Sequence, residues 1–164
     1  MTSIEFRAPW SESLPTTTLV AVAFPALIVT AAIFERAPAL AAVLMIGLPA
    51  LIFVAAVAGR VRGYTLTEEA ITVPRGLGDT RLPLTGLRTV TGDVDAMHGS
   101  IRLLANNGVF SFTGRFWNSK LGWYRAFVTD PSRAVVLRYP KRTIVISPHD
   151  PLHFIMRAGS LIKV

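Results

Sequence analysis

The chain has 164 residues, of which 51% are hydrophobic and 16% are charged, and its mean hydropathy is +0.47. This composition is too apolar for an ordinary soluble domain and favours a membrane-anchored protein over a soluble enzyme. The absence of cysteine excludes disulfides, thiolate nucleophiles and cysteine-based zinc sites.

The first third of the chain contains two long runs without a charged residue. Residues 1–15 are polar and carry proline and serine, so we expect them to be irregular. Residues 16–34 and 39–59 are the uncharged runs, and "ERAP" separates them. Each run is about as long as a bilayer-crossing helix, which needs ~20 apolar residues at a rise of ~1.5 Å. The sequence therefore predicts a transmembrane helical hairpin over residues 16–59.

Basic residues indicate how this hairpin is oriented. Arg7 precedes the first run and Arg60 and Arg62 follow the second, whereas the connecting loop carries Arg36 offset by Glu35. Basic residues accumulate on the cytoplasmic side, so we expect a multi-pass protein with both termini in the cytoplasm. A cleaved signal peptide is a poorer explanation, because the first run lacks a strongly basic start and a second run follows directly.

Residues 60–164 are numerous enough for a domain with its own core. The runs "YTLT", "AITVPR", "TRLPLTGLRTVTGDV", "GVFSFTGRF", "LGWYRAFVTD", "AVVLRY" and "TIVIS" are rich in strand-forming residues and separated by turn signals. Alternation in "GVFSFTGRF" places Phe110, Phe112 and Phe116 on one face. We expect Phe116, Phe127 and Val128 to belong to the core.

The hydrophobic period changes near the C-terminus, which predicts a helix over about residues 151–162. Asp150 can cap its start, and Pro151 suits the first helical position. Apolar side chains at helical spacing are expected to share its buried face: Leu152, Ile155, Met156 and Leu161. The predicted fold class is α+β, in which a bent antiparallel sheet or partial barrel is capped by the C-terminal helix.

Four segments in this order resemble the bacterial PH-domain membrane proteins, which are pleckstrin-homology-like. They are "YTLTEEAITVPRG", "LPLTGLRTV", "HGSIRL…NGVFSFTGRFWNSKLGWYRAFVTD" and "IVISPHDPLHFI". The resemblance covers roughly residues 63–158. It departs from the family pattern at "LANNG", where a glycine-rich turn would be usual. It implies a PH-like fold and a setting in the bacterial plasma (inner) membrane, but it implies no reaction.

No catalytic, cofactor-binding or metal-binding residues are predicted, and we expect no enzyme. "HDPLH" has the spacing of a zinc-binding helix, but Pro151 lies between its histidines and suits a helix start instead. Asp93 and Asp95 lack a partner base and fit a solvated turn. "TGRFWNSK" does not match an RNA-binding pattern, so no nucleic-acid partner is expected.

Two functions remain open for the domain. The first is a non-catalytic module at the cytoplasmic leaflet that mediates interaction with a protein partner or self-assembly. The second is a sensor of anionic lipid headgroups or a small ligand, suggested by ten Lys and Arg residues against two acids in residues 97–164. Its candidate residues are Arg102, Arg115, Trp117, Lys120, Trp123 and Arg125. The same residues could instead form an ordinary solvated sheet face.

Overall fold

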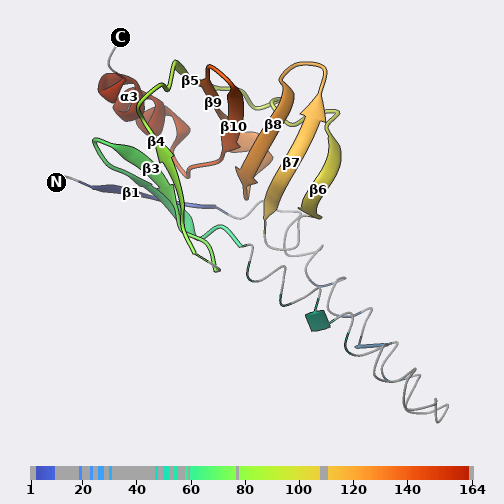
Figure 1. The fold of residues 1–164 in the computed structure, drawn as a ribbon. Coiled ribbons are helices and arrows are strands. Elements are labelled where there is room, and N and C mark those ends of the chain that lie inside the picture. The colour runs from blue at the N-terminus through green and yellow to red at the C-terminus, as the bar shows by residue number, and fades with distance from the viewer. Residues whose placement is uncertain are drawn as a thin grey trace.

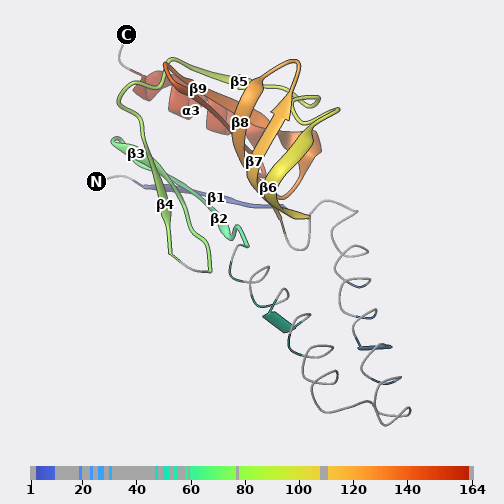
Figure 2. The same ribbon diagram turned by 45° about the vertical axis from the view of Figure 1, so that its right-hand side comes forward.

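The computed structural model describes residues 3–9, 60–76, 78–107 and 111–162, together with scattered positions between 19 and 58. Two sheets and one C-terminal helix form the part of the chain that was expected to be PH-like (Figures 1 and 2). The first sheet is antiparallel and the second is mixed. The first sheet has the order β1-β2-β3-β4 and the second β5-β9-β10-β8-β7-β6.

The elements of the first sheet are β1 (Ile4–Arg7), β2 (Gly63–Leu66), β3 (Ala70–Val73) and β4 (Thr80–Pro83). Those of the second are β5 (Thr89–Gly92), β6 (Ile101–Asn107), β7 (Phe112–Asn118), β8 (Gly122–Val128), β9 (Val135–Tyr139) and β10 (Arg142–Ile146). The 3₁₀ turn η1 (Pro131–Arg133) leads into β9, and α3 (Pro151–Leu161) follows β10. The predicted β2–β3 hairpin and C-terminal helix are confirmed.

The N-terminal strand differs from the sequence-based expectation. Residues 1–15 were expected to be irregular, but Ile4–Arg7 form β1 and pair antiparallel with β2. The register places Phe6 opposite Tyr64, and the Phe6 side chain is 6% exposed. A four-residue strand is too short to stand out in a sequence, and β1 is defined by a partner that lies far along the chain.

We had expected a purely antiparallel sheet, but the second sheet contains one parallel pair of strands. β10 lies between β9 and β8 and pairs with β8 in parallel, with Ile144 opposite Arg125. The reason is the connection: β8 passes through η1 into β9, and a tight hairpin then returns the chain between the two strands as β10. β10 consequently runs in the same direction as β8.

Helix α3 starts as predicted, but only part of its predicted buried face packs on the core. The Asp150 carboxylate accepts a hydrogen bond from the His153 amide at 3.0 Å, and Pro151 occupies the first turn. Ile155 and Leu161 are partly buried against the core cluster, as expected. Phe154 and Ala158 are fully buried, whereas Leu152 and Met156 are 72% and 63% exposed. Apolar residues surround most of this helix, so spacing alone did not select the face that packs on the sheets.

Burial is divided between the two faces of the second sheet. Phe127 belongs to the cluster that fills the space between the sheets and α3, together with Tyr64 and Phe154. Phe116 and Val128 belong to a second cluster on the opposite face. All three residues expected in the core are therefore buried, although in two clusters. Phe112 is half-buried against the second cluster, and Phe110 lies outside the described residues.

A buried hydroxyl group joins the two sheets. The Tyr64 hydroxyl of β2 donates to the Phe127 carbonyl of β8 at 2.6 Å and accepts from the Ser147 amide at 3.1 Å. The Ser147 hydroxyl in turn accepts from the Thr129 amide at 2.8 Å. Complete burial raises the pKa of Tyr64 to about 12. This network holds the end of β8 and the end of β10 against the first sheet.

The predicted transmembrane hairpin lies almost entirely outside the described residues. Within the part of the chain that the structure does describe, no helix has the length and apolar character needed to cross a membrane. The scattered positions that are described between 19 and 58 are helical. Among them, Leu19, Leu27, Leu51 and Val54 are each more than 60% exposed.

Removing the Tyr64 hydroxyl is expected to weaken the junction between the sheets. Tyr64→Phe keeps the ring but leaves the Phe127 carbonyl and the Ser147 amide without their buried partner. We expect the free energy of unfolding to fall by about 1–3 kcal/mol. Denaturant unfolding of the full chain in detergent, followed by tryptophan fluorescence, would measure the change.

The stability of the parent chain and that of the Tyr64→Phe variant should depend differently on pH. The folded state retains the Tyr64 proton above the ordinary pKa of 10, so folded protein binds more protons than unfolded protein between pH 10 and 12. The stabilisation is complete below pH 10 and is lost as the pH rises toward 12. The stability advantage over Tyr64→Phe should therefore narrow in this range. A constant difference would contradict the assigned role of the hydroxyl.

Candidate functional site

A cleft of about 680 Å³ opens between β4 of the first sheet and strands β8 and β10 of the second. Five of its lining side chains are cations: Arg81, Arg115, Arg125, Lys141 and Arg142. Its apolar lining includes Leu82, Leu103, Trp123 and Ile144. No Asp or Glu is among the lining residues.

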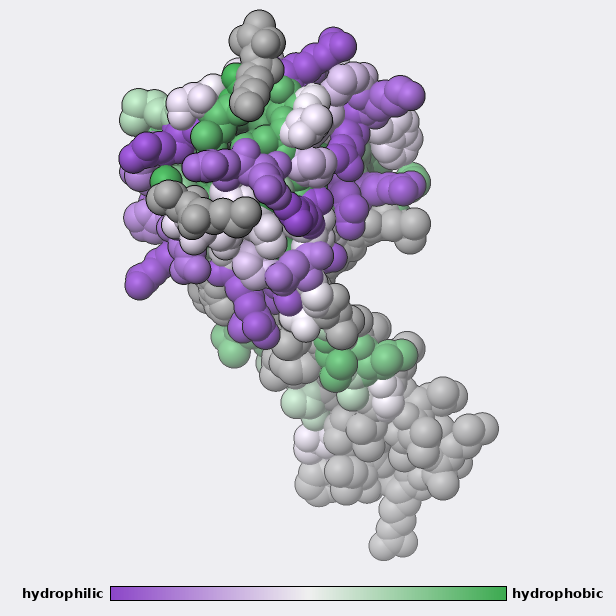
Figure 3. Space-filling model, turned by 60° about the vertical axis from the view of Figure 1, so that its left-hand side comes forward, coloured by the Kyte–Doolittle hydropathy of each residue, from purple (hydrophilic) through white to green (hydrophobic). Residues whose placement is uncertain are grey.

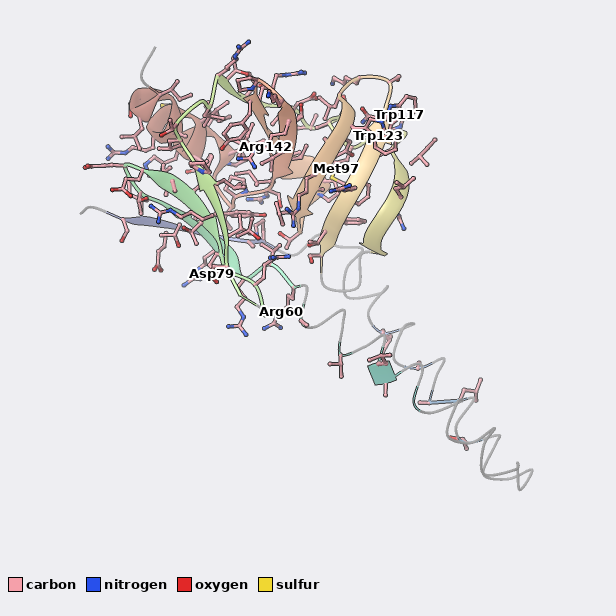
Figure 4. All side chains as sticks on the ribbon, viewed as in Figure 1. Arg60, Asp79, Met97, Trp117, Trp123 and Arg142 are labelled. Carbon is pink, nitrogen blue, oxygen red and sulfur yellow. The ribbon has the colours of Figure 1, made fainter. Side chains whose placement is uncertain are left out.

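Strand register explains why side chains from distant parts of the sequence meet there. Arg115 lies directly opposite Arg125, and Trp117 lies opposite Trp123, in the β7–β8 pair. Residues two apart in a strand share a face, so these four side chains lie on one side of the sheet. Figure 4 labels both tryptophans on the β7–β8 hairpin.

The parallel β10–β8 pair adds a third strand to this face. Ile144 is opposite Arg125, and Arg142 is two residues before Ile144, so the Arg142 side chain falls on the same face. Figure 4 labels Arg142 at the β9–β10 hairpin. The Arg142 guanidinium carbon lies 4.7 Å from the centre of the Tyr139 ring, which supports the side chain through a cation–π contact.

The cleft is the open continuation of the core between the sheets. Phe127 and Ile144 share the face of the second sheet that the first sheet covers, and they are 0% and 2% exposed. Two residues earlier on each strand come Arg125 and Arg142, and Trp123 beyond them is 60% exposed. The sheets therefore separate along β8, and polar and aromatic side chains replace the buried apolar ones.

Two arginines contact the buried Phe127 ring, and one of them, Arg125, also lines the cleft. The guanidinium carbons of Arg125 and Arg75 lie 4.8 Å and 5.5 Å from the ring centre. Burial lowers the pKa of Arg125, and the charges of Arg75, Arg115 and Arg142 lower it further. The Arg75 Nε atom is buried and finds no acceptor among the described residues. The surroundings of Arg125 in the cleft are thus strongly electropositive.

Carboxylates neutralise little of this charge. Arg81 pairs with Glu69 at 2.6 Å on the rim, where both side chains are mostly exposed. In the described part of the chain, no carboxylate lies within ion-pair distance of Arg115, Arg125 or Arg142. Such an arrangement can bind anions but offers no general base or nucleophile beside them.

The structure brings together only some of the residues singled out from the sequence. Arg115, Trp123 and Arg125 line the cleft, and Trp117 lies beside them on the same face. Lys120 lies in the β7–β8 turn, where its ammonium contacts the Asp93 carboxylate at 2.6 Å. Arg102 is paired with buried Phe116 in the β6–β7 register, which places it on the opposite face of the sheet.

Sequence reasoning missed the lining cations from β4 and from the β9–β10 hairpin, which are Arg81, Lys141 and Arg142. It also missed Arg75, which follows β3 and contacts the Phe127 ring. Two of these cations, Lys141 and Arg142, stand in the sequence "PKR" after Tyr139, which was interpreted only as a turn. Only the insertion of β10 beside β8 brings Lys141 and Arg142 to the cleft.

The "HDPLH" segment is used to start α3. Asp150 caps the helix, and the His153 ring lies 5.5 Å from the Phe6 ring. Across the described residues there is no group of three or more His, Asp or Glu side chains that could hold a metal ion.

Comparison with known proteins agrees with this architecture. The family described as Bacterial PH domain matches residues 62–161, which is more than half of the chain. No curated protein and no solved structure matches the chain. PH domains are generally non-catalytic binding modules, which fits a cleft lined by cations and aromatic side chains. From the matched residues, the two sheets and the closing helix α3, we conclude that the chain belongs to the bacterial PH domain family.

Proposed function

We propose that this protein is a non-catalytic binding module carried on a two-helix membrane anchor, with its PH-like domain at the cytoplasmic leaflet of a bacterial plasma membrane. The β1–β2 pair is the observation that carries the proposal. Arg7 lies opposite Gly63, so the chain leaves the domain and returns to the same place. A bilayer-crossing segment whose two ends meet must cross an even number of times. The uncharged runs 16–34 and 39–59 supply two crossings.

Surface character supports the same placement. Hydrophilic side chains cover much of the visible face of the domain, whereas the described positions between 19 and 58 present hydrophobic side chains (Figure 3). Exposed leucines on helical positions are unfavourable in water and favourable in lipid. Arg7, Arg60 and Arg62 lie at the two ends of the segment, where the positive-inside preference expects them in the cytoplasm.

Topology can be mapped cleanly because the chain has no native cysteine. We expect Ser3→Cys and Glu68→Cys to react with an impermeant maleimide in inside-out vesicles, because both positions lie on the cytoplasmic side. Ala37→Cys, in the predicted loop, should react only in right-side-out vesicles. Gel-shift detection of the labelled protein would measure each reaction.

The cysteine-free parent chain serves as the control for non-specific labelling. Labelling of Ser3→Cys and Glu68→Cys from opposite sides of the membrane would exclude the hairpin. Labelling of all three variants in both vesicle preparations would show that the chain is not inserted.

For the binding partner, the cleft favours an anionic ligand over a protein. Like charges directly opposite one another in a sheet are destabilising, yet Arg115 and Arg125 are such a pair. Arg75 and Arg142 add to the repulsion on Arg125. The repulsion among these arginines lowers the stability of the empty domain. An anion bound among the guanidinium groups would remove the repulsion, so the destabilising arrangement is consistent with a binding site.

Removing one of these charges should stabilise the empty domain. Arg115 is exposed, so Arg115→Gln removes a charge with little loss of packing. We expect its free energy of unfolding to rise by a few tenths of a kcal/mol at low ionic strength, and the gain to shrink in high salt. Arg138→Gln, at an exposed position on the other face of the second sheet, is the matched control. A destabilised Arg115→Gln variant would contradict the repulsion inferred among these arginines.

A protein partner or self-association is the second candidate, and the β6 edge favours it. β6 is the last strand of the second sheet, and its Ile101 and Leu103 side chains are 62% and 61% exposed. An unpaired edge with apolar side chains can add a strand from another chain. Light scattering of the detergent-solubilised protein tests this. Dimers that Ile101→Lys dissociates, and that Arg115→Gln leaves intact, would establish the edge as the binding surface.

A further inference from the structure

We infer that the cleft is a binding site for a phosphate monoester, whose terminal oxygens are held by Arg115, Arg125 and Arg142. The inference rests on the anion-binding function proposed for the cleft, but not on the membrane anchor. The three arginines come from three neighbouring strands, β7, β8 and β10.

The number and kind of donors select phosphate among anions. A guanidinium group has five N–H donors in a rigid fork that matches phosphate and carboxylate oxygens. Three such groups converge here without an acid among the lining residues, and Lys141 adds a fourth charge at the rim. A carboxylate has only two oxygens and one charge, so it would leave most donors unused. A terminal phosphate has three oxygens and close to two charges at neutral pH.

Charge within the cleft favours a dianion over a monoanion. Arg125 lies opposite Arg115, and both Arg125 and Arg75 contact the Phe127 ring, so several cations repel one another before any ligand binds. A doubly charged group offsets more of this repulsion than a phosphodiester, which carries one charge. The site should therefore prefer a monoester to a diester.

The size of the cleft leaves room for a ligand larger than an inorganic ion. Its volume of about 680 Å³ lies in the range of sites for whole organic ligands, roughly 300–1,000 Å³. Beside the arginines, Trp123 and Leu103 are 60% and 61% exposed and offer an apolar contact surface. The ligand is thus a phosphate monoester whose organic part covers these two side chains.

Two sources could supply this chemistry: a lipid with a terminal phosphate, or a soluble phosphorylated compound. The test uses the full chain in phosphatidylcholine nanodiscs. Glycerol 3-phosphate and inorganic phosphate are titrated by calorimetry, and a second preparation contains phosphatidic acid in the disc. Phosphatidylglycerol discs serve as the phosphodiester comparison, and thermal unfolding reports occupancy in the discs.

We expect glycerol 3-phosphate to bind, or phosphatidic acid to stabilise the protein more than phosphatidylglycerol does. The first result identifies a soluble source and the second a lipid source. Arg115→Gln and Arg142→Gln should each weaken binding about tenfold or more, because each removes charge-assisted hydrogen bonds. Arg138→Gln should bind like the parent chain. Circular dichroism of each variant confirms that the fold is retained.

Three results would overturn the inference. They are no response of the parent chain to any monoester, equal losses in Arg115→Gln and Arg138→Gln, or a preference for phosphatidylglycerol over phosphatidic acid. None of them bears on the cysteine-labelling result. If the phosphate titration fails but the cysteines label as expected, the proposed membrane-anchored module still stands. If phosphate binds but the cysteines do not label as expected, only the proposed anchor is excluded.

Discussion

The architecture depends on the junction at which the Tyr64 hydroxyl meets the Phe127 carbonyl and the Ser147 amide. This junction is buried, so none of its polar groups can exchange its partner for water. It fixes the distance between the two sheets at one end of β8. The sheets separate toward the other end of β8, and this separation forms the cleft. The core and the cleft are therefore the closed and open parts of one space between the sheets.

The parallel placement of β10 determines what that open space contains. An antiparallel meander would have put β9 beside β8 and left Lys141 and Arg142 away from the cleft. Inserting β10 between them brings Arg142 to the face that carries Arg115 and Arg125. The aromatic rings of Phe127 and Tyr139 then support the guanidinium groups through cation–π contacts. Topology, rather than any local motif, assembles the positive charge.

Local chemistry in the sequence was sufficient for some features of the fold. Asp150 and Pro151 defined the start of α3, and the turn between β2 and β3 was recognisable. Long-range features were not predictable: β1 depends on a partner distant in the chain, and β10, although recognisable as a strand, pairs with β8 across an intervening strand. The same limit applied to the cleft. Arg115, Trp123 and Arg125 are neighbours in one hairpin and were identified, whereas Arg81, Lys141 and Arg142 come from β4 and the β9–β10 hairpin.

If the proposed anchor is present, the pairing of β1 with β2 makes folding of the domain depend on correct insertion of both apolar runs. In the proposed topology, Ile4–Arg7 stay unpaired on the cytoplasmic side until β2, which follows the apolar segment in the sequence, has been synthesised. A chain that inserted only one of its two runs would leave β1 across the membrane from β2. Tyr64 would then lack Phe6 as its neighbour, and the first sheet would expose an unpaired edge. Incorrectly inserted copies would thus be incompletely folded, and quality-control proteases could recognise them by that defect.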